Sequence, residues 1–360
     1  MCAENNLRLR ESIGIIVHEH NVEFFKSNVR DGFSLKIECP DVIKILRKFD
    51  GKTTIDNIVK SNASIDKLQL EKLAYYLKDE FVLIEQNIQY PIEVLEKDYR
   101  LINLLEDYFH STAEVLDAIE KLKKSTVMIV GLGAVGSIIS AYLAKCGVGN
   151  LVLVDNDLVD LSNLHRQYYF EKSIESNKSI ELSNELKSIN PEINISIIPS
   201  FLKNDFFTVT KIPKKLELII NCSDEPSVDV TSNIISKYAM QHKIPHIVGG
   251  GYNLHLTLIG QTIIPYESAC FECFKTALNT INDNDLIKVR SLHRKNRKLG
   301  SFAPLSGIAA SLASLDAFKV LIHRYDVLQQ TNKRIEFNIH DLNFQTINIE
   351  RNPECKWCGD

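Results

Sequence analysis

The chain has 360 residues, enough for one large and one small domain, and 44% of them are hydrophobic, enough for sizeable buried cores. The net charge of −4 is mild, so the overall balance gives no reason to expect nucleic-acid or membrane partners. The N-terminus has neither a basic start nor an apolar core, so no secretory signal is visible and a cytoplasmic location is expected.

Residues 1–88 are expected to fold as a separate small α+β domain. Short runs rich in β-branched and aromatic residues predict strands at residues 13–17, 22–26, 33–39 and 81–85. Amphipathic patterns predict helices at residues 41–49, 53–60 and 64–77, the last of them capped by Ser64.

A linker is expected at residues 89–98, because Pro91 interrupts any helical pattern there. One helix is then predicted from about Tyr99 to about Lys124. The uncharged run at residues 125–144 is long enough to suggest a membrane span. Its glycines divide it into a short strand and a helix, as in a βα unit, so no membrane segment is expected.

A glycine-rich turn follows the apolar strand predicted at residues 126–130. Gly131, Gly133 and Gly136 lack side chains, so main-chain N–H groups at the start of the next helix can approach an anion such as phosphate. A second apolar strand ends in Asp155, about 20 residues beyond the glycines, where a carboxylate can hydrogen-bond ribose hydroxyls.

Polar residues beyond Asp155 distinguish this chain from hydride-transfer enzymes, which do not need them. Arg166 and Gln167 place a cation and an amide beside the phosphates, which suits attack at phosphorus. A later strand at residues 216–222 leads into Asp224. Ligands lie beyond the carboxyl ends of such strands, and this carboxylate suits Mg²⁺, which prefers oxygen ligands and bridges phosphates.

Two Cys-x-x-Cys pairs indicate a structural zinc site. Their four thiolates match a closed tetrahedral site better than disulfides or redox motifs would in a reducing compartment. The predicted zinc ligands are Cys270, Cys273, Cys355 and Cys358. Among the other cysteines, Cys222 lies within an apolar strand and is expected to pack in the core.

A dense basic run occupies residues 288–298. It can be a solvated loop, or a lid over triphosphate or an acidic peptide. A nucleic-acid surface is a weaker interpretation, because the run lacks aromatic residues that would stack on bases. The helix predicted at residues 305–322 follows it.

Taken together, Gly-x-Gly-x-x-Gly, Asp-x-Asp, Ser-Asn-Leu-x-Arg-Gln, a later lysine and the two cysteine pairs resemble the ThiF/MoeB or ubiquitin-activating-type adenylyltransferases, which join AMP to a carboxylate. The resemblance implies that ATP binds with Gly131, Gly133 and Gly136 at phosphate and Asp155 at ribose. It implies triphosphate contacts from Asn163, Arg166, Gln167 and Lys178. It also makes Asp224 a magnesium ligand, and makes Arg100 an arginine that reaches the triphosphate of a partner subunit.

Some members of that family carry a nucleophilic cysteine after the first zinc pair. No cysteine occurs between Cys273 and Cys355 here, so the acyl-adenylate is expected to be passed on without an enzyme thioester.

The element order of residues 1–88 resembles winged-helix peptide clamps, which bind the leader of a ribosomally made peptide. The candidate edge strand for this is residues 34–38.

The expected protein is therefore a homodimer. Each chain would have a Rossmann-like α/β adenylation domain at residues 99–360, with a mixed sheet and a zinc site, preceded by the clamp. This architecture resembles that of the MccB/PaaA-like antibiotic-maturation enzymes. Its expected partner is a precursor peptide with a leader, and no nucleic acid or membrane. The alternatives are a sulfur-carrier adenylyltransferase for thiamin or molybdopterin synthesis, and a winged-helix nucleotide-sensing regulator.

Overall fold

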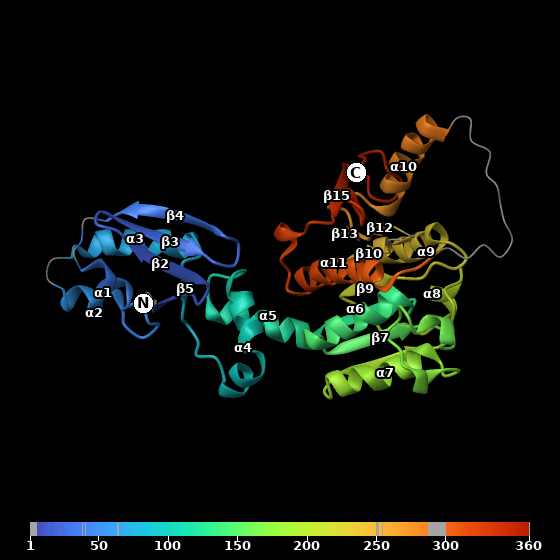
Figure 1. Cartoon of the computed structure of the whole chain (residues 1–360), viewed down its shortest axis with the longest axis horizontal. Coiled ribbons are helices and arrows are strands. Elements are labelled where there is room, and N and C mark those ends of the chain that lie inside the picture. Colours follow the sequence, from blue (N-terminus) through green and yellow to red (C-terminus); the bar gives the residue numbers. More distant parts are fainter. Residues whose placement is uncertain are drawn as a thin grey trace. The chain divides into compact units, whose positions relative to one another are not determined.

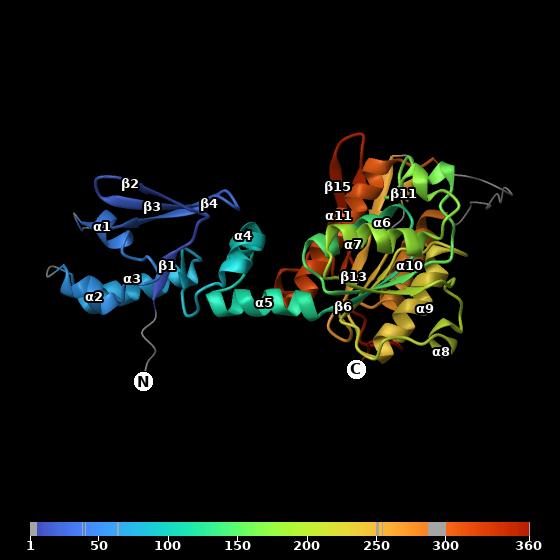
Figure 2. The same cartoon turned by 90° about the horizontal axis from the view of Figure 1, so that it is seen from below.

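The computed structural model describes residues 6–37, 39, 41–62, 65–249, 252–253, 255–286 and 300–359. The chain forms two compact units, residues 1–120 and 121–360, and Figures 1 and 2 show its elements from two sides. The basic run at residues 288–298 lies outside the described residues, and so does Ser64.

The N-terminal unit contains two small antiparallel sheets. The strands β2 (Ile13–Val17), β3 (Asn21–Lys26) and β4 (Asp31–Lys36) pair in that order, so β4 lies at an edge. The second sheet joins β1 (Leu7–Leu9) to β5 (Leu83–Glu85). This agrees with the predicted strands, except that β1 was not expected.

Three helices complete the core of this unit, as predicted: α1 (Val42–Leu46), α2 (Ile55–Lys60) and α3 (Lys67–Asp79). Leu46, Ile58 and Leu77 are buried between them and the sheets. The cap of α3 is Asp66, whose side chain accepts from the Gln69 N–H at 2.9 Å, so the predicted serine cap was wrong.

Two helices, α4 (Ile92–Glu106) and α5 (Thr112–Lys124), replace the single helix predicted from Tyr99. Pro91 caps α4 at its N-terminus, where the missing N–H costs nothing, so most of the predicted linker at 89–98 is helical. The helical structure is interrupted between α4 and α5. Just before α5, the N–H groups of His110 and Ser111 donate to the Glu114 side chain. Glu106 also accepts from Arg8 at 2.5 Å, which explains why the compact unit extends beyond residue 98.

The C-terminal unit is an α/β fold on a six-stranded mixed sheet, as predicted. The strand order is β13-β10-β9-β6-β7-β8, and every neighbouring pair is parallel except β10 and β13. In chain order the strands are β6 (Thr126–Val130), β7 (Asn150–Val154), β8 (Asn194–Ile198), β9 (Leu218–Asn221), β10 (His246–Val248) and β13 (Gln261–Ile263). A second, four-stranded sheet contains β11 (Tyr252–Asn253), β12 (Leu256–Ile259), β14 (Lys333–Asn338) and β15 (Asn343–Asn348).

Helices connect and cover these sheets. They are α6 (Ala134–Lys145), α7 (Lys178–Ile189), α8 (Phe206–Val209), α9 (Val228–Gln241), α10 (Phe271–Leu286) and α11 (Ala303–Leu321). Three single 3₁₀ turns are η1 (Leu161–Asn163), η2 (Glu171–Ser173) and η3 (Tyr325–Val327). The run at residues 125–144 forms β6 and most of α6, as predicted.

Among the described residues, α11 alone is long and apolar enough to cross a membrane by those criteria. However, 56% of its apolar window is buried inside the fold, and it lies alongside α6 (Figures 1 and 2). Core helices of globular proteins commonly meet the same criteria, so α11 is explained as the central helix of this unit.

Candidate active site

The glycine turn between β6 and α6 is shaped by close main-chain packing. Gly131 has φ of +84°, and a Cβ there would lie 2.6 Å from the Ser223 nitrogen. A Cβ on Gly136 would lie 2.0 Å from the Gly131 oxygen. Gly133 is different, because its Cβ would meet nothing nearer than Gln167 Nε2 at 3.9 Å. The turn therefore leaves open space in front of the α6 N-terminus, where an anion is favoured.

Asp155 follows β7 and fixes this turn from the next strand. Its Oδ2 accepts from the Leu132 N–H at 2.7 Å, and its Oδ1 accepts from the Asp157 N–H at 2.8 Å. Each carboxylate oxygen can accept a second hydrogen bond, so the group can still receive ribose hydroxyls. Asp155 is therefore in contact with the glycine turn, and its role at ribose remains a prediction.

Lys178 lies at the first position of α7, and the fold brings it to the carboxyl end of β7. Its Nζ lies 2.9 Å from Asp157 Oδ2, and its main-chain N–H donates to the Asp157 carbonyl at 2.9 Å. The lysine side chain is 8% exposed and the aspartate side chain 50% exposed. The charge of a largely buried ammonium is thus paired, in a position close to the predicted nucleotide site.

The segment around η1 carries three further predicted residues. Asn163 is buried and its Oδ1 accepts from the Asp160 N–H at 3.1 Å, so it shapes the turn itself. Arg166 donates from Nη1 to the Ser162 carbonyl at 2.7 Å. Gln167 Oε1 is buried and has no hydrogen-bond partner among the described residues, as expected for an acceptor that awaits a ligand.

Asp224 follows β9 and is exposed, with no partner for its carboxylate within the described ranges. Because Gly131 packs directly against Ser223, the loop that carries Asp224 touches the glycine turn. An exposed carboxylate on a loop that touches the glycine turn fits a Mg²⁺ ligand. Asp224 as a magnesium ligand remains a prediction, as do the other ligand roles.

Arg100 lies in the N-terminal unit, on the exposed side of α4. Its Nε donates to the Tyr99 hydroxyl at 2.8 Å. Its assignment to a triphosphate stays a prediction.

The four predicted zinc ligands come together in the C-terminal unit. The Sγ atoms of Cys270 and Cys355 are 3.5 Å apart, as are those of Cys273 and Cys358, and all four lie within 4.8 Å of one another. Sulfurs at tetrahedral positions about 2.3 Å from one zinc ion would be about 3.8 Å apart. The residues therefore fit a zinc ion with four protein ligands and no open coordination position.

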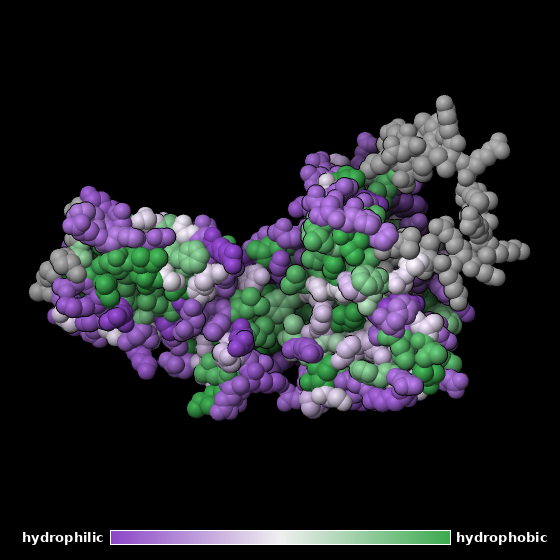
Figure 3. Space-filling model, in the orientation of Figure 1, coloured by the Kyte–Doolittle hydropathy of each residue, from purple (hydrophilic) through white to green (hydrophobic). Residues whose placement is uncertain are grey.

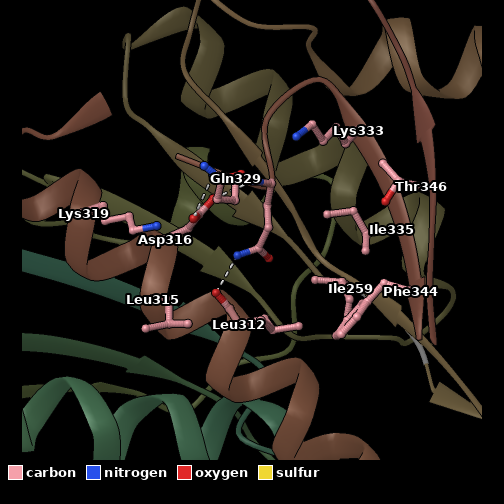
Figure 4. Close-up of a pocket in the computed structure, with 11 residues that line it drawn as sticks. Ile259, Leu312, Leu315, Asp316, Lys319, Gln329, Lys333, Ile335, Phe344 and Thr346 are labelled. Atoms are coloured by element: carbon pink, nitrogen blue, oxygen red, sulfur yellow. Dashed lines mark hydrogen bonds between the residues drawn. The ribbon is translucent and has the colours of Figure 1, made fainter. Parts of the chain in front are cut away.

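A pocket of about 310 Å³ lies apart from these residues, between α11 and the four-stranded sheet (Figure 4). Its floor includes Asp316, whose Oδ2 accepts from the Thr262 hydroxyl at 2.8 Å and the Gln330 N–H at 3.1 Å. This carboxylate connects α11 to β13, and the pocket contains no predicted nucleotide or zinc residue.

Comparison with known proteins identifies the family. Residues 110–357 match the ThiF family model. The chain belongs to the ThiF family. It is 30% identical over 247 residues to the molybdopterin-synthase adenylyltransferase of Escherichia coli, covering 68% of this chain and 90% of that protein.

Solved structures extend the likeness of this ThiF protein to nearly the whole chain. E. coli MccB matches with a TM-score of 0.78 at 23% identity, covering 98% of this chain and 97% of MccB. PaaA matches with a TM-score of 0.71 at 21% identity over 95% of this chain. The family and the molybdopterin-synthase adenylyltransferase relative indicate an ATP-dependent adenylyltransferase. This does not support the predicted alternative of a nucleotide-sensing regulator.

Two further side chains that the sequence patterns did not indicate contact the glycine turn. The Tyr169 hydroxyl donates to the Leu132 carbonyl at 2.8 Å, and burial raises its pKa well above the usual value. Ser137 donates to the Gly133 carbonyl and accepts from the Tyr168 N–H at 3.2 Å. Both tie the segment after η1 to the glycine turn. The only signal was the position of Tyr168 and Tyr169 directly after Arg166 and Gln167.

Proposed function

We propose that this protein uses ATP and Mg²⁺ to adenylate a carboxylate of a ribosomally made precursor peptide during antibiotic maturation, as a homodimer in the cytoplasm. The main supporting observation is how far the structural likeness extends. The ThiF model begins at residue 110, whereas the likeness to MccB includes 98% of the chain and hence most of the N-terminal unit. A sulfur-carrier enzyme has no evident need for that extra unit.

The chemistry follows from the charges gathered at the strand ends. A carboxylate oxygen of the peptide attacks the α-phosphorus of ATP, the new O–P bond forms, and the bond to the β-phosphate oxygen breaks to release pyrophosphate. Magnesium, when bound, would neutralise charge on the phosphates, held by Asp224. Lys178 and Arg166 would contribute fixed positive charge, and the glycine turn would orient the phosphates. Catalysis by this arrangement is mainly positioning and charge stabilisation.

A peptide substrate is suggested by the solved relatives and by the edge strand β4. MccB has been solved with ATP and, as the microcin C7 biosynthetic enzyme, with N-formylated MccA. In this chain the Ile37 N–H donates to the His20 carbonyl at 3.3 Å, just beyond the β3–β4 pairing. Antiparallel alternation then directs the N–H group of Ser34 to the free edge, where an extended leader could add as a strand.

Apolar side chains lie close to that edge. The Phe33 ring of β4 meets the Tyr76 ring of α3 at 5.7 Å between centroids, and Tyr76 and Leu68 of α3 are 43% and 58% exposed. Figure 3 shows an apolar area on the visible face of the N-terminal unit, below β4. A leader with apolar side chains at alternate positions would fit such a surface. Residues 1–88 as leader clamp and 99–360 as adenylation domain are part of this proposal.

Neither Cys146 nor Cys222 is an activated thiol that could form an enzyme thioester. Burial raises the pKa of Cys222 to about 12 and also raises the pKa of Cys146, so both thiols are held in the unreactive form. The acyl-adenylate would therefore pass directly to its acceptor.

A second candidate, a sulfur-carrier adenylyltransferase, is favoured by the 30% identity to the molybdopterin enzyme. ATP–pyrophosphate exchange separates the two candidates. The purified protein would be assayed with a short peptide encoded beside its own gene, and in parallel with a carrier protein that ends in Gly-Gly. Exchange that depends on the short peptide supports the proposal. Exchange that depends only on the carrier protein overturns it.

A further inference from the structure

The connection between β9 and α9 is held by a buried network of polar side chains. Asn221, the last residue of β9, is fully buried, and its Oδ1 accepts from the Ser223 N–H at 3.2 Å. Its Nδ2 donates to the hydroxyls of Thr231 at 3.1 Å and Ser232 at 3.2 Å, both on α9. The Thr231 hydroxyl donates in turn to the Ser223 carbonyl at 2.7 Å. Both main-chain polar groups of Ser223 are therefore fixed by buried side chains.

Two glycines close around the same connection. A Cβ on Gly131 would lie 2.6 Å from the Ser223 nitrogen, and a Cβ on Gly249 would lie 2.4 Å from the Asn221 oxygen. Main chain therefore packs against main chain on two sides, which leaves the Asn221–Ser223 connection little freedom to shift. Asp224 is the next residue and the first exposed one.

We infer that Thr231 and Asn221 are positioning residues that set the direction of the Asp224 carboxylate and thereby its affinity for Mg²⁺. Neither side chain reaches solvent, and both act through the main chain of Ser223. This inference rests on the proposed role of Asp224. The Thr231 hydroxyl also lies 3.2 and 3.1 Å from the carbonyl oxygens of Ser227 and Val228 at the start of α9. Its shortest contact, 2.7 Å, is to the Ser223 carbonyl in the loop that carries the carboxylate.

The test compares variants that differ by one hydroxyl. Thr231→Val keeps the shape and loses the hydroxyl, whereas Thr231→Ser keeps the hydroxyl. Ser236→Ala is the matched control, because Ser236 is a buried residue of the same helix whose hydroxyl has no partner among the described residues. Binding of a fluorescent ATP analogue is titrated against Mg²⁺ for each protein, and hydrogen exchange at Ser223 and Asp224 is followed by mass spectrometry.

We expect Thr231→Val to need about tenfold more Mg²⁺ for half-maximal enhancement of nucleotide binding. A loss of metal affinity of this size is typical when a residue that orients a metal ligand is removed. Exchange at Ser223 should be faster, while binding without Mg²⁺ stays unchanged. Thr231→Ser and Ser236→Ala should match the wild type. Should Thr231→Val fail to fold, Ser232→Ala removes one partner of Asn221 and should produce a smaller shift in the same direction.

Failure of this inference can be told apart from failure of the proposed function. If Asp224→Ala retains the full Mg²⁺ dependence, the magnesium assignment itself is wrong. If Asp224→Ala loses that dependence while Thr231→Val and Ser232→Ala behave as the wild type, Asp224 holds the metal and the positioning role is wrong. Equal shifts in the Mg²⁺ requirement of Thr231→Val and Ser236→Ala would also overturn the positioning role. The loss of any buried hydroxyl from α9 would then have the same effect. In the Asp224→Ala background, Thr231→Val should add no further change.

Discussion

Lys178 Nζ lies 2.9 Å from Asp157 Oδ2, and the two side chains differ in exposure, 8% against 50%. The ammonium is held in place by the fold, whereas the carboxylate faces solvent. Incoming phosphates would therefore meet a positioned cation whose present partner can be displaced outward.

From this pair we expect Lys178→Ala to lower the rate of ATP–pyrophosphate exchange by about 10²-fold, since it removes a partly desolvated charge contact. Lys172→Ala is the control, because that lysine side chain is 69% exposed and pairs with Glu185. Steady-state exchange assays with both variants check this. Equal activity of Lys178→Ala and Lys172→Ala would contradict the assignment.

An assay of peptide-dependent AMP formation tests the other two charged groups. Asp224→Ala and Arg166→Ala should each lose on the order of 10²-fold or more in peptide-dependent AMP formation. Asp229→Ala, an exposed aspartate in the first turn of α9, should stay near the wild type. A folded Asp224→Ala protein with normal activity would rule out the predicted magnesium ligand.

Elemental analysis should find one zinc per chain in freshly purified protein. Cys355→Ser and Cys358→Ser should each lose the metal and lower the melting temperature, because a structural zinc site contributes directly to folding. Cys39→Ser, in the other unit, should keep the zinc. Absence of zinc from the wild-type protein would be decisive against the site.

The edge strand β4 gives a test of leader binding. Ser34→Pro removes a main-chain donor on the free edge without removing a bond to β3, and proline is tolerated on edge strands. Affinity for a labelled precursor peptide should fall at least about tenfold, with ATP binding unchanged. Ser34→Ala, which keeps the N–H, should bind like the wild type. If both variants bind normally, the leader docks elsewhere.

His246 should make the fold sensitive to acid. Complete burial lowers its pKa from 6.5 to about 4, so the folded protein excludes a proton that the unfolded chain accepts. The free energy of unfolding should therefore decrease as the pH falls from 6.5 to 4, by roughly 3 kcal/mol from this residue. In urea titrations, His246→Leu should lose less stability over that interval than the wild type. A substitution of the exposed His165 should leave the pH dependence of the free energy of unfolding unchanged.

The sequence predicted the features that depend on local patterns. The apolar runs gave β6, β7 and β9, the glycines gave the turn before α6, and the paired cysteine spacing gave the metal cluster. Asp155 directly follows β7, as its place after the second apolar run indicated. The contact of Lys178 with Asp157 was not predicted.

What the sequence could not show depends on contacts between distant residues. The strand β1 has three residues, two of them leucines around Arg8, and pairs with β5 more than seventy positions later. No periodicity exists in so short a segment. The partly buried contact of Arg8 with Glu106, 98 positions apart, likewise has no local signature, and it is part of what makes α4 belong to the first unit.

The cysteine cluster has a consequence for how the chain responds to cutting. Cys270 and Cys355 are 85 positions apart. A metal ion bound by all four sulfurs would therefore close a ring of peptide bonds and metal–sulfur bonds that contains α11, β14 and β15. A protease that cleaved one peptide bond inside this ring would leave two fragments still joined through the metal. They would migrate as one species until a chelator was added, and would then come apart only if the remaining contacts of α11 and β14 were also broken.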